Sequence, residues 1–156
     1  MRIVYPLIIL CICSFFVTQA QNSYHWSGDA GTLSWNDPGN WEEGIVPTSS
    51  DYAYFDNVGT ITVEIGDAGN IVDSVSELHI IGTSDIEFQS FDINEERILG
   101  VLDYVEISEG SVISILTPSP GGVQILIEGT AEIWGVVELD FEGSFGPNVG
   151  MEGNIP

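Results

Sequence analysis

Basic side chains are almost missing from this sequence, which holds 2 Lys and Arg residues against 24 Asp and Glu residues. The two bases are Arg2 and Arg97, and there is no Lys. A chain with a formal net charge of −22 repels phosphate backbones, so nucleic-acid binding is excluded as a function. Anionic membrane surfaces are poor partners for the same reason, unless cations bridge the two surfaces.

Cysteine is equally scarce, and both cysteines, Cys11 and Cys13, lie among the first 20 residues. The chain after Ala20 therefore cannot form an internal disulfide. Its stability must come from packing and hydrogen bonds, even in an oxidising compartment that would permit disulfides.

Residues 1–20 have the pattern of a cleavable signal peptide. Arg2 supplies a positive charge, residues 3–17 are almost wholly apolar, and residues 18–20 resemble a small-residue cleavage site. An apolar run of about 15 residues is shorter than the roughly 20 that a membrane anchor needs, which disfavours that alternative. We expect a secreted or outer cell-surface protein with no transmembrane segment after cleavage.

The chain that remains after cleavage, residues 21–156, is acidic but not composed like a disordered one. Arg97 stands against 24 acidic residues, a formal charge of 1 − 24 = −23. Hydrophobic residues make up 44% of the sequence, which is enough apolar surface to build a core. The charge is therefore more consistent with a solvated surface than with an unfolded chain, although cation binding is the alternative.

Short runs of β-branched and aromatic residues, divided by Gly, Ser, Asn and Asp, predict an all-β fold. The clearest period-two alternation is at residues 137–142, where acidic and apolar residues alternate. Only residues 94–99 offer a short helix candidate. The predicted strands cover residues 52–55, 60–65, 77–81, 86–88, 99–107, 112–116, 123–127, 131–134 and 136–141.

A weak repeat favours a parallel β-helix over a β-sandwich. Gly82-Thr83, Gly110-Ser111 and Gly129-Thr130 each separate two strand-like runs, at spacings of 28 (110 − 82) and 19 (129 − 110). Repeated strand–turn–strand units of about this length are typical of solenoids. A β-sandwich also joins short strands by Gly turns, and it remains the alternative.

Residues 24–56 differ from the rest because they hold three of the four Trp residues and several turn formers. Pro38 and Gly39 stand in a strong turn signal between Asp37 and Asn40. The motif of this region is Trp26-Ser27-Gly28, then Trp35-Asn36-Asp37-Pro38-Gly39-Asn40-Trp41, then Pro47-Thr48, Asp51 and Phe55-Asp56.

This motif resembles the N-terminal region of secreted β-helical surface proteins of Gram-negative bacteria, which are autotransporter-like or adhesin-like. The resemblance implies an aromatic-rich N-terminal cap over residues 21–56, followed by β-helical rungs over residues 57–156. Such relatives are usually longer, and the Gly-rich end at residues 153–156 resembles no cap. We therefore expect the rung region to be truncated at the C-terminus.

A cap is needed because the first rung of a β-helix would otherwise expose unpaired backbone groups. Trp side chains offer large apolar areas for covering that end, and Asp and Pro side chains define the turns between them. A sugar-binding aromatic platform is the alternative role for the same Trp residues. The expected cap residues are Trp26, Trp35, Asp37, Pro38, Asn40, Trp41, Pro47, Asp51 and Phe55.

The sequence indicates no catalytic residues. Lyases of acidic sugars need Lys or Arg, and only Arg97 is present. His25 and His79 lie in an aromatic run and in a strand, where packed side chains are expected. Calcium is the one cofactor with any support, because carboxylates cluster among turn formers. Its candidate ligands are Asp29, Asp37, Asp51 and Asp56.

These observations lead to three hypotheses. The first is a non-catalytic structural or adhesive scaffold that meets surface glycans or proteins of a host or cell surface. The second is a carbohydrate-binding module, which would need exposed rings at Trp35 and Trp41. The third is a fragment of a β-helical polysaccharide-degrading enzyme, since hydrolases need only a pair of suitably spaced carboxylates.

Overall fold

The computed structural model describes residues 21–56, 58–92, 94–116 and 121–140. The expected signal peptide at residues 1–20 and the last expected rung residues, 141–156, lie outside the described residues. Among the residues that are described, no helix is long and apolar enough to cross a membrane.

The chain coils into a β-solenoid of about 4 turns, with 54% of the described residues in strands and 3% in helices. Every pairing between named strands is parallel. This confirms the expected parallel β-helix, because a β-sandwich would pair its strands antiparallel. The strands are β1 (Ser23–His25), β2 (Tyr52–Asp56), β3 (Thr60–Ile65), β4 (Val72–Ile81), β5 (Asp85–Ser90), β6 (Arg97–Ile107), β7 (Val112–Leu116), β8 (Val123–Ile127), β9 (Thr130–Ile133) and β10 (Val136–Asp140), with one 3-10 helix, η1 (Pro38–Asn40).

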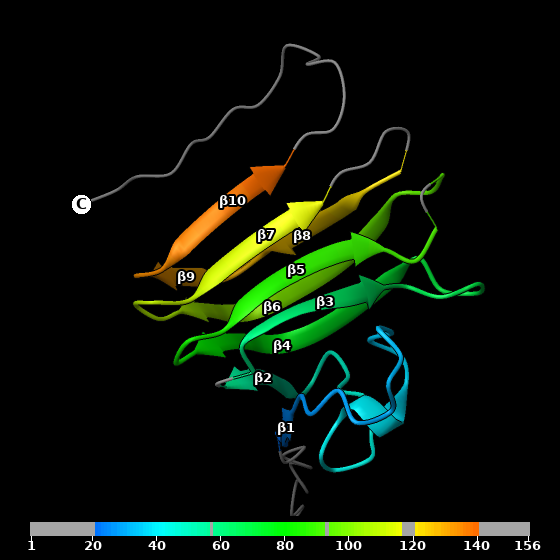
Figure 1. The fold of residues 1–156 in the computed structure, drawn as a ribbon, viewed down its shortest axis with the longest axis horizontal. Helices are drawn as coiled ribbons and strands as arrows, with labels where there is room; N and C mark the ends of the chain where they lie inside the picture. The colour runs from blue at the N-terminus through cyan, green and yellow to red at the C-terminus, as the bar shows by residue number, and fades with distance from the viewer. Residues whose placement is uncertain (1–20, 57, 93, 117–120, 141–156) are drawn as a thin grey trace, which may run out of the picture.

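The strands form two sheets, and the chain alternates between them from β2 to β8 (Figure 1). The first sheet has the order β1-β2-β4-β6-β8, and β9 also pairs with β6. We call it sheet A. The second, sheet C, has the order β10-β7-β5-β3. Figure 1 shows the loops of the N-terminal region at one end of this stack, beyond β2.

The register between strands defines the length of a turn. In sheet A, Tyr52, Glu77, Tyr104 and Thr130 lie side by side on successive turns. The repeat is therefore 25 (77 − 52), 27 (104 − 77) and 26 (130 − 104) residues long. A repeat of this length, with each turn touching only its neighbours, is the defining property of a solenoid.

The long strands β4 and β6 each contribute two strand segments to a single turn. The register of β4 shifts between Val75 and Glu77, which marks a bulge. Likewise, β6 pairs with β8 through residues 97–101 and with β9 through residues 104–107. Each complete turn thus contains three strand segments, one in sheet C and two in sheet A.

One part of the expected repeat is wrong. Gly82 and Gly110 do occupy the same corner, because a Cβ on Gly110 would lie 3.6 Å from the Gly82 carbonyl oxygen. Gly129 instead lies at the corner between β8 and β9, against the backbone of Asp103. The corner above Gly110 belongs to Gly135, 25 residues later (135 − 110). Two different corners of the solenoid therefore share the same local strand–Gly–strand pattern.

The core is one continuous column of inward-facing side chains from all the turns. Its members alternate with outward-facing residues, as along Ile86 and Phe88 of β5. Toward the last described strand this burial declines. Val137 is in register with the buried Ile113 but is 43% exposed, because no further described strand covers it.

Candidate functional site

The Trp residues of the N-terminal region pack into the end of the core rather than facing solvent. Trp26, Trp35 and Trp41 are 4%, 1% and 2% exposed. The ring of Trp41 meets Trp35 at 4.9 Å and Trp26 at 5.2 Å, both edge to face, and Phe55 of β2 lies against all three. The Trp41 Nε1–H also donates to the Trp35 carbonyl at 2.9 Å. These rings close the apolar end of the solenoid.

The turn at residues 37–40 holds these rings in place. The carboxylate of Asp37 accepts a hydrogen bond from the Gly39 N–H at 3.0 Å and so caps η1, which begins at Pro38. The buried Asn40 donates through Nδ2 to the carbonyls of Thr32 and Ser34. The loop between Trp26 and Trp41 is thus folded back on itself by side-chain hydrogen bonds.

A second turn, at residues 47–51, leads into β2 at the end of the cap. Pro47 is buried, and the carboxylate of Asp51 accepts hydrogen bonds from the Thr48 N–H and hydroxyl at 3.0 and 2.6 Å, and from Asn22. Burial pushes the pKa of Asp51 upward, but these hydrogen bonds outweigh it, so the pKa lies below its ordinary value. Asp51 is therefore a structural anion of the cap.

The structure does not gather the four calcium candidates into one site. Asp37 and Asp51 are engaged in their own turns, and Asp56 lies 3.3 Å from His25 Nδ1. Asp29 is exposed in the loop between β1 and η1. Over the described ranges, no group of three or more His, Cys, Asp or Glu side chains could hold a metal ion.

A ladder of stacked rings runs along the outer face of sheet A, one ring from each of four neighbouring strands. The His25 ring stacks on Tyr54 at 5.0 Å, and Tyr54 stacks on His79 at 4.4 Å with an interplanar angle of 5°. Tyr104 follows, tilted by 52° at 5.7 Å from His79. The parallel register places these side chains on one face of β1, β2, β4 and β6.

Carboxylates flank this ladder on both sides of His79. The imidazole Nε2 lies 2.8 Å from Glu77, and Nδ1 lies 3.0 Å from Glu106 of the next turn. Both contacts are hydrogen bonds when both ring nitrogens carry a proton. His79 is only 7% exposed, so it is a packed side chain, as the sequence indicated. Its ring ties two acidic turns together.

The phenol hydroxyls beside these carboxylates stay protonated. Burial raises the pKa of Tyr52 and Tyr54, and the negative charge of Glu77 raises both further. Burial also raises the pKa of Tyr104, with a hydrogen bond to Glu132 adding to the effect. The outer face of sheet A therefore presents phenol hydroxyls and carboxylates side by side on successive turns. We refer to this set of side chains as the sheet A ladder: His25, Tyr52, Tyr54, Glu77, His79, Tyr104, Glu106 and Glu132.

Sequence reasoning did not find this ladder, because its members are ordinary outward-facing residues in separate strands. The signal that could have found it is the repeat of 25 to 27 residues, which aligns Tyr54, His79, Glu106 and Glu132. The alignment can be recognised only when the register between neighbouring strands is known. The expected repeat placed Gly129 at the same corner as Gly110, and this error obscured the register.

Arg97, the one base available for anion recognition after residue 20, is not at the surface. It is 2% exposed at the start of β6, with Nη2 bound to Glu95 at 2.9 Å. Nearby, the buried carboxylate of Asp73 accepts from the Gly66 N–H at 2.7 Å and from the side chain of Asn36 at 3.1 Å. Burial raises the pKa of Asp73, against the lowering effect of these hydrogen bonds. The hydrogen bond between Asn36 and Asp73 thus links the cap to the first turn of the solenoid.

No protein-family model, curated protein or solved structure matches this chain.

Proposed function

We propose that this chain is a non-catalytic scaffold of a secreted or cell-surface protein, with an adhesive outer face on sheet A. The observation that carries the proposal is the sheet A ladder, which runs unbroken across successive turns. An adhesive surface needs a rigid backbone that presents the same kinds of side chain at regular intervals along its length. The solenoid register supplies that repetition for the ladder.

The packing of the rings favours a scaffold over a sugar-stacking platform at the N-terminal end. A sugar stacks on an exposed ring face, but the faces of Tyr54 and His79 lie against each other. Trp35 and Trp41 are buried in the cap. The ladder can therefore meet a partner only through ring edges, hydroxyls and carboxylates, which suits hydrogen bonding to glycan hydroxyls or to polar protein surfaces.

The proposed location outside the cytoplasm rests on residues 1–20, with their charge, apolar run and cleavage-site pattern. Expression of the full chain in a Gram-negative host tests it directly. We expect an exported product whose N-terminus is Gln21. A product that stays in the cytoplasm with Met1 at its N-terminus would contradict this part of the proposal.

The adhesive role can be tested with the full chain immobilised on beads and passed over arrays of neutral glycans and cell-surface proteins. Replacing Tyr52, Tyr54 and Tyr104 together by Phe keeps the stacked rings and removes only the hydroxyls. We expect retention on the bound surface to fall at least about tenfold, the loss of two or more hydrogen bonds. The matched control is Glu138→Gln, an exposed change on sheet C.

Two results would contradict the adhesive role. One is equal retention of the triple Phe variant and the unaltered chain. The other is release of reducing sugar from a neutral glycan by the unaltered chain, which would indicate an enzyme instead.

A carbohydrate-binding module remains the second candidate because of one residue. Trp134, between β9 and β10, is 72% exposed, so its ring is open for stacking against a sugar. If glycan retention is lost in the Trp134→Ala variant and is unchanged in the triple Phe variant, this second function replaces the first.

A further inference from the structure

Strand β3 is an edge strand of sheet C, and its two backbone edges can be told apart. On one edge, Gly59 and Ile65 bond through their carbonyls to Asp85 and Phe91, on the β5 side. On the other edge, Glu64 bonds to the cap, with its N–H on the Leu33 carbonyl and its carbonyl on the Trp35 N–H. Because successive residues of a strand alternate, Thr60 and Thr62 also point their N–H and C=O groups toward the cap.

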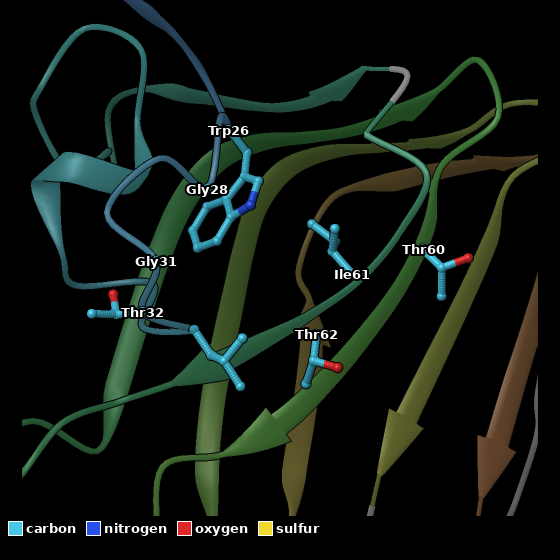
Figure 2. Close-up of a pocket in the computed structure, with 8 residues that line it drawn as sticks. Trp26, Gly28, Gly31, Thr32, Thr60, Ile61 and Thr62 are labelled. Carbon is cyan, nitrogen blue, oxygen red and sulfur yellow. The ribbon is translucent and has the colours of Figure 1, made fainter.

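The cap covers only one end of this edge. Residues 33–35 run parallel beside Glu64, but the preceding loop, with Gly28 and Gly31 at positive φ, turns away from β3. A cavity of about 330 Å³ lies between this loop and the strand (Figure 2). Within the described chain, no backbone partner faces Thr60 or Thr62 across it.

Other groups in the cavity also lack a partner or are apolar. The indole Nε1 of Trp26 makes no hydrogen bond among the described residues, whereas that of Trp41 does. Figure 2 shows the Trp26 ring on the loop side of the space and Ile61 on the strand side. The side chains of Ile61 and Leu33 give the cavity an apolar surface.

The rim of the cavity is negative, because each threonine that lines it contacts a carboxylate. The hydroxyl of Thr32 donates to Asp37 at 2.9 Å, and that of Thr62 donates to Glu87 at 3.2 Å. The hydroxyl of Thr60 lies 3.4 Å from Asp85. No cation pairs with these three carboxylates in the described part of the chain.

We propose that this cavity binds an extended peptide segment with an apolar centre and Lys or Arg flanks, which adds a strand to the free edge of β3. Two free N–H and C=O pairs, two residues apart, have the spacing of a β-ladder and not that of a sugar ring. The apolar centre would contact Ile61 and Leu33, and the flanks would meet Asp37, Asp85 and Glu87. This inference is independent of the ladder on sheet A.

The test uses the full chain and a fluorescein-labelled probe, the acetylated and amidated peptide Lys-Val-Ile-Val-Lys, followed by fluorescence anisotropy. One comparison peptide has Glu in place of both Lys residues. A second carries N-methyl groups on alternate amides, which removes the backbone N–H donors needed for strand pairing without changing the charge of the peptide. We expect saturable binding of the probe and at least about tenfold weaker binding of both comparison peptides, the loss of roughly 1.4 kcal/mol.

Protein variants locate the site. Thr62→Pro removes the N–H that faces the cavity and leaves the β5 ladder intact, so probe binding should be lost. Thr62→Val keeps that N–H and should keep binding within about twofold. If Thr62→Pro does not fold, the N-methylated peptide on the unaltered chain decides the question.

Three outcomes would overturn the proposal. They are the absence of saturable binding at millimolar probe, equal binding of the probe and its N-methylated form, and unchanged binding by a folded Thr62→Pro variant. Equal binding of the Glu-flanked peptide would likewise remove the stated charge preference.

Discussion

The imidazole of His79 stacks nearly parallel on the phenol ring of Tyr54 on the neighbouring turn, with centroids 4.4 Å apart and planes inclined by 5°. The same imidazole holds Glu77 on one side and Glu106 on the other. One side chain thus joins three turns of an otherwise strongly acidic surface. This arrangement makes His79 the residue of the ladder whose loss should matter most.

Replacing His79 by Ala should destabilise the fold by about 2 kcal/mol, because it removes a stacked ring and leaves two carboxylates facing each other. Urea unfolding followed by circular dichroism measures the change. The control is His25→Ala, at the exposed end of the ladder with one carboxylate neighbour, where we expect about 0.5 kcal/mol. Equal effects at the two positions would show that the ladder does not couple the turns.

The Trp cluster of the cap should be the most sensitive part of the molecule. Trp41→Ala removes a ring that is 2% exposed together with its hydrogen bond to Trp35, and we expect a loss of about 3–5 kcal/mol. The same substitution at Trp134, which is 72% exposed, should cost less than about 0.5 kcal/mol. Thermal unfolding compares the two variants.

The Trp41→Ala variant should also associate with itself as its concentration rises, because a loosened cap frees the end of the β3 edge at Glu64, which Leu33 and Trp35 otherwise cover. Light scattering would detect this. A monomeric variant with unchanged stability would mean that the cap does not close the solenoid.

The stability of the protein should depend on Asp51 as the pH falls. Because its pKa is lowered in the fold, the unfolded chain binds the proton more tightly. The contribution of Asp51 is therefore complete above the unfolded pKa of about 3.9 and is lost as the pH falls through the lower, folded value.

We expect Asp51→Asn to cost about 1–3 kcal/mol at about pH 7 and to reduce the difference in stability between about pH 7 and about pH 3. Urea unfolding at the two pH values measures it. Asp73, whose pKa is raised, acts in the opposite direction: its ionisation costs stability as the pH rises through its folded pKa. Identical pH dependence in the Asp51→Asn variant and the unaltered chain would contradict the assigned role.

Close approach of backbone makes Gly129 irreplaceable. A Cβ there would lie 1.9 Å from the Asp103 carbonyl oxygen, so Gly129→Ala should separate β8 and β9 from β6 at a cost of about 1–3 kcal/mol. Gly69→Ala is the control, since its Cβ would meet only the Asp67 side chain at 3.6 Å. Hydrogen exchange should show faster exchange in β8 and β9 for the first variant alone.

The sequence was sufficient to predict strands and fold class, because period-two patterns and Gly turns are local. The predicted strands 60–65, 112–116 and 123–127 match β3, β7 and β8 residue for residue. The first half of β4, residues 72–75, was missed because Asp73 and Ser74 interrupt its apolar pattern. Asp73 is tolerated there because its carboxylate accepts hydrogen bonds from the Gly66 N–H and from the side chain of Asn36.

The candidate site was harder to predict than the fold. The ladder depends on which residue of one strand lies beside which residue of the next, and that register follows from loop lengths between strands. Gly129 and Gly110 look alike in sequence but lie at different corners. The pairing of Tyr54 with His79 therefore could not be derived from either strand alone.

The hydrogen bonds between neighbouring strands run along the axis of the stack, since β2, β4 and β6 follow one another in that direction. A tensile load applied along the axis would pull these bonds lengthwise and open the solenoid one turn at a time. A load across the axis would instead act along the strands. A surface protein built this way would yield gradually under axial tension, and the stacked column of rings would add resistance at each step.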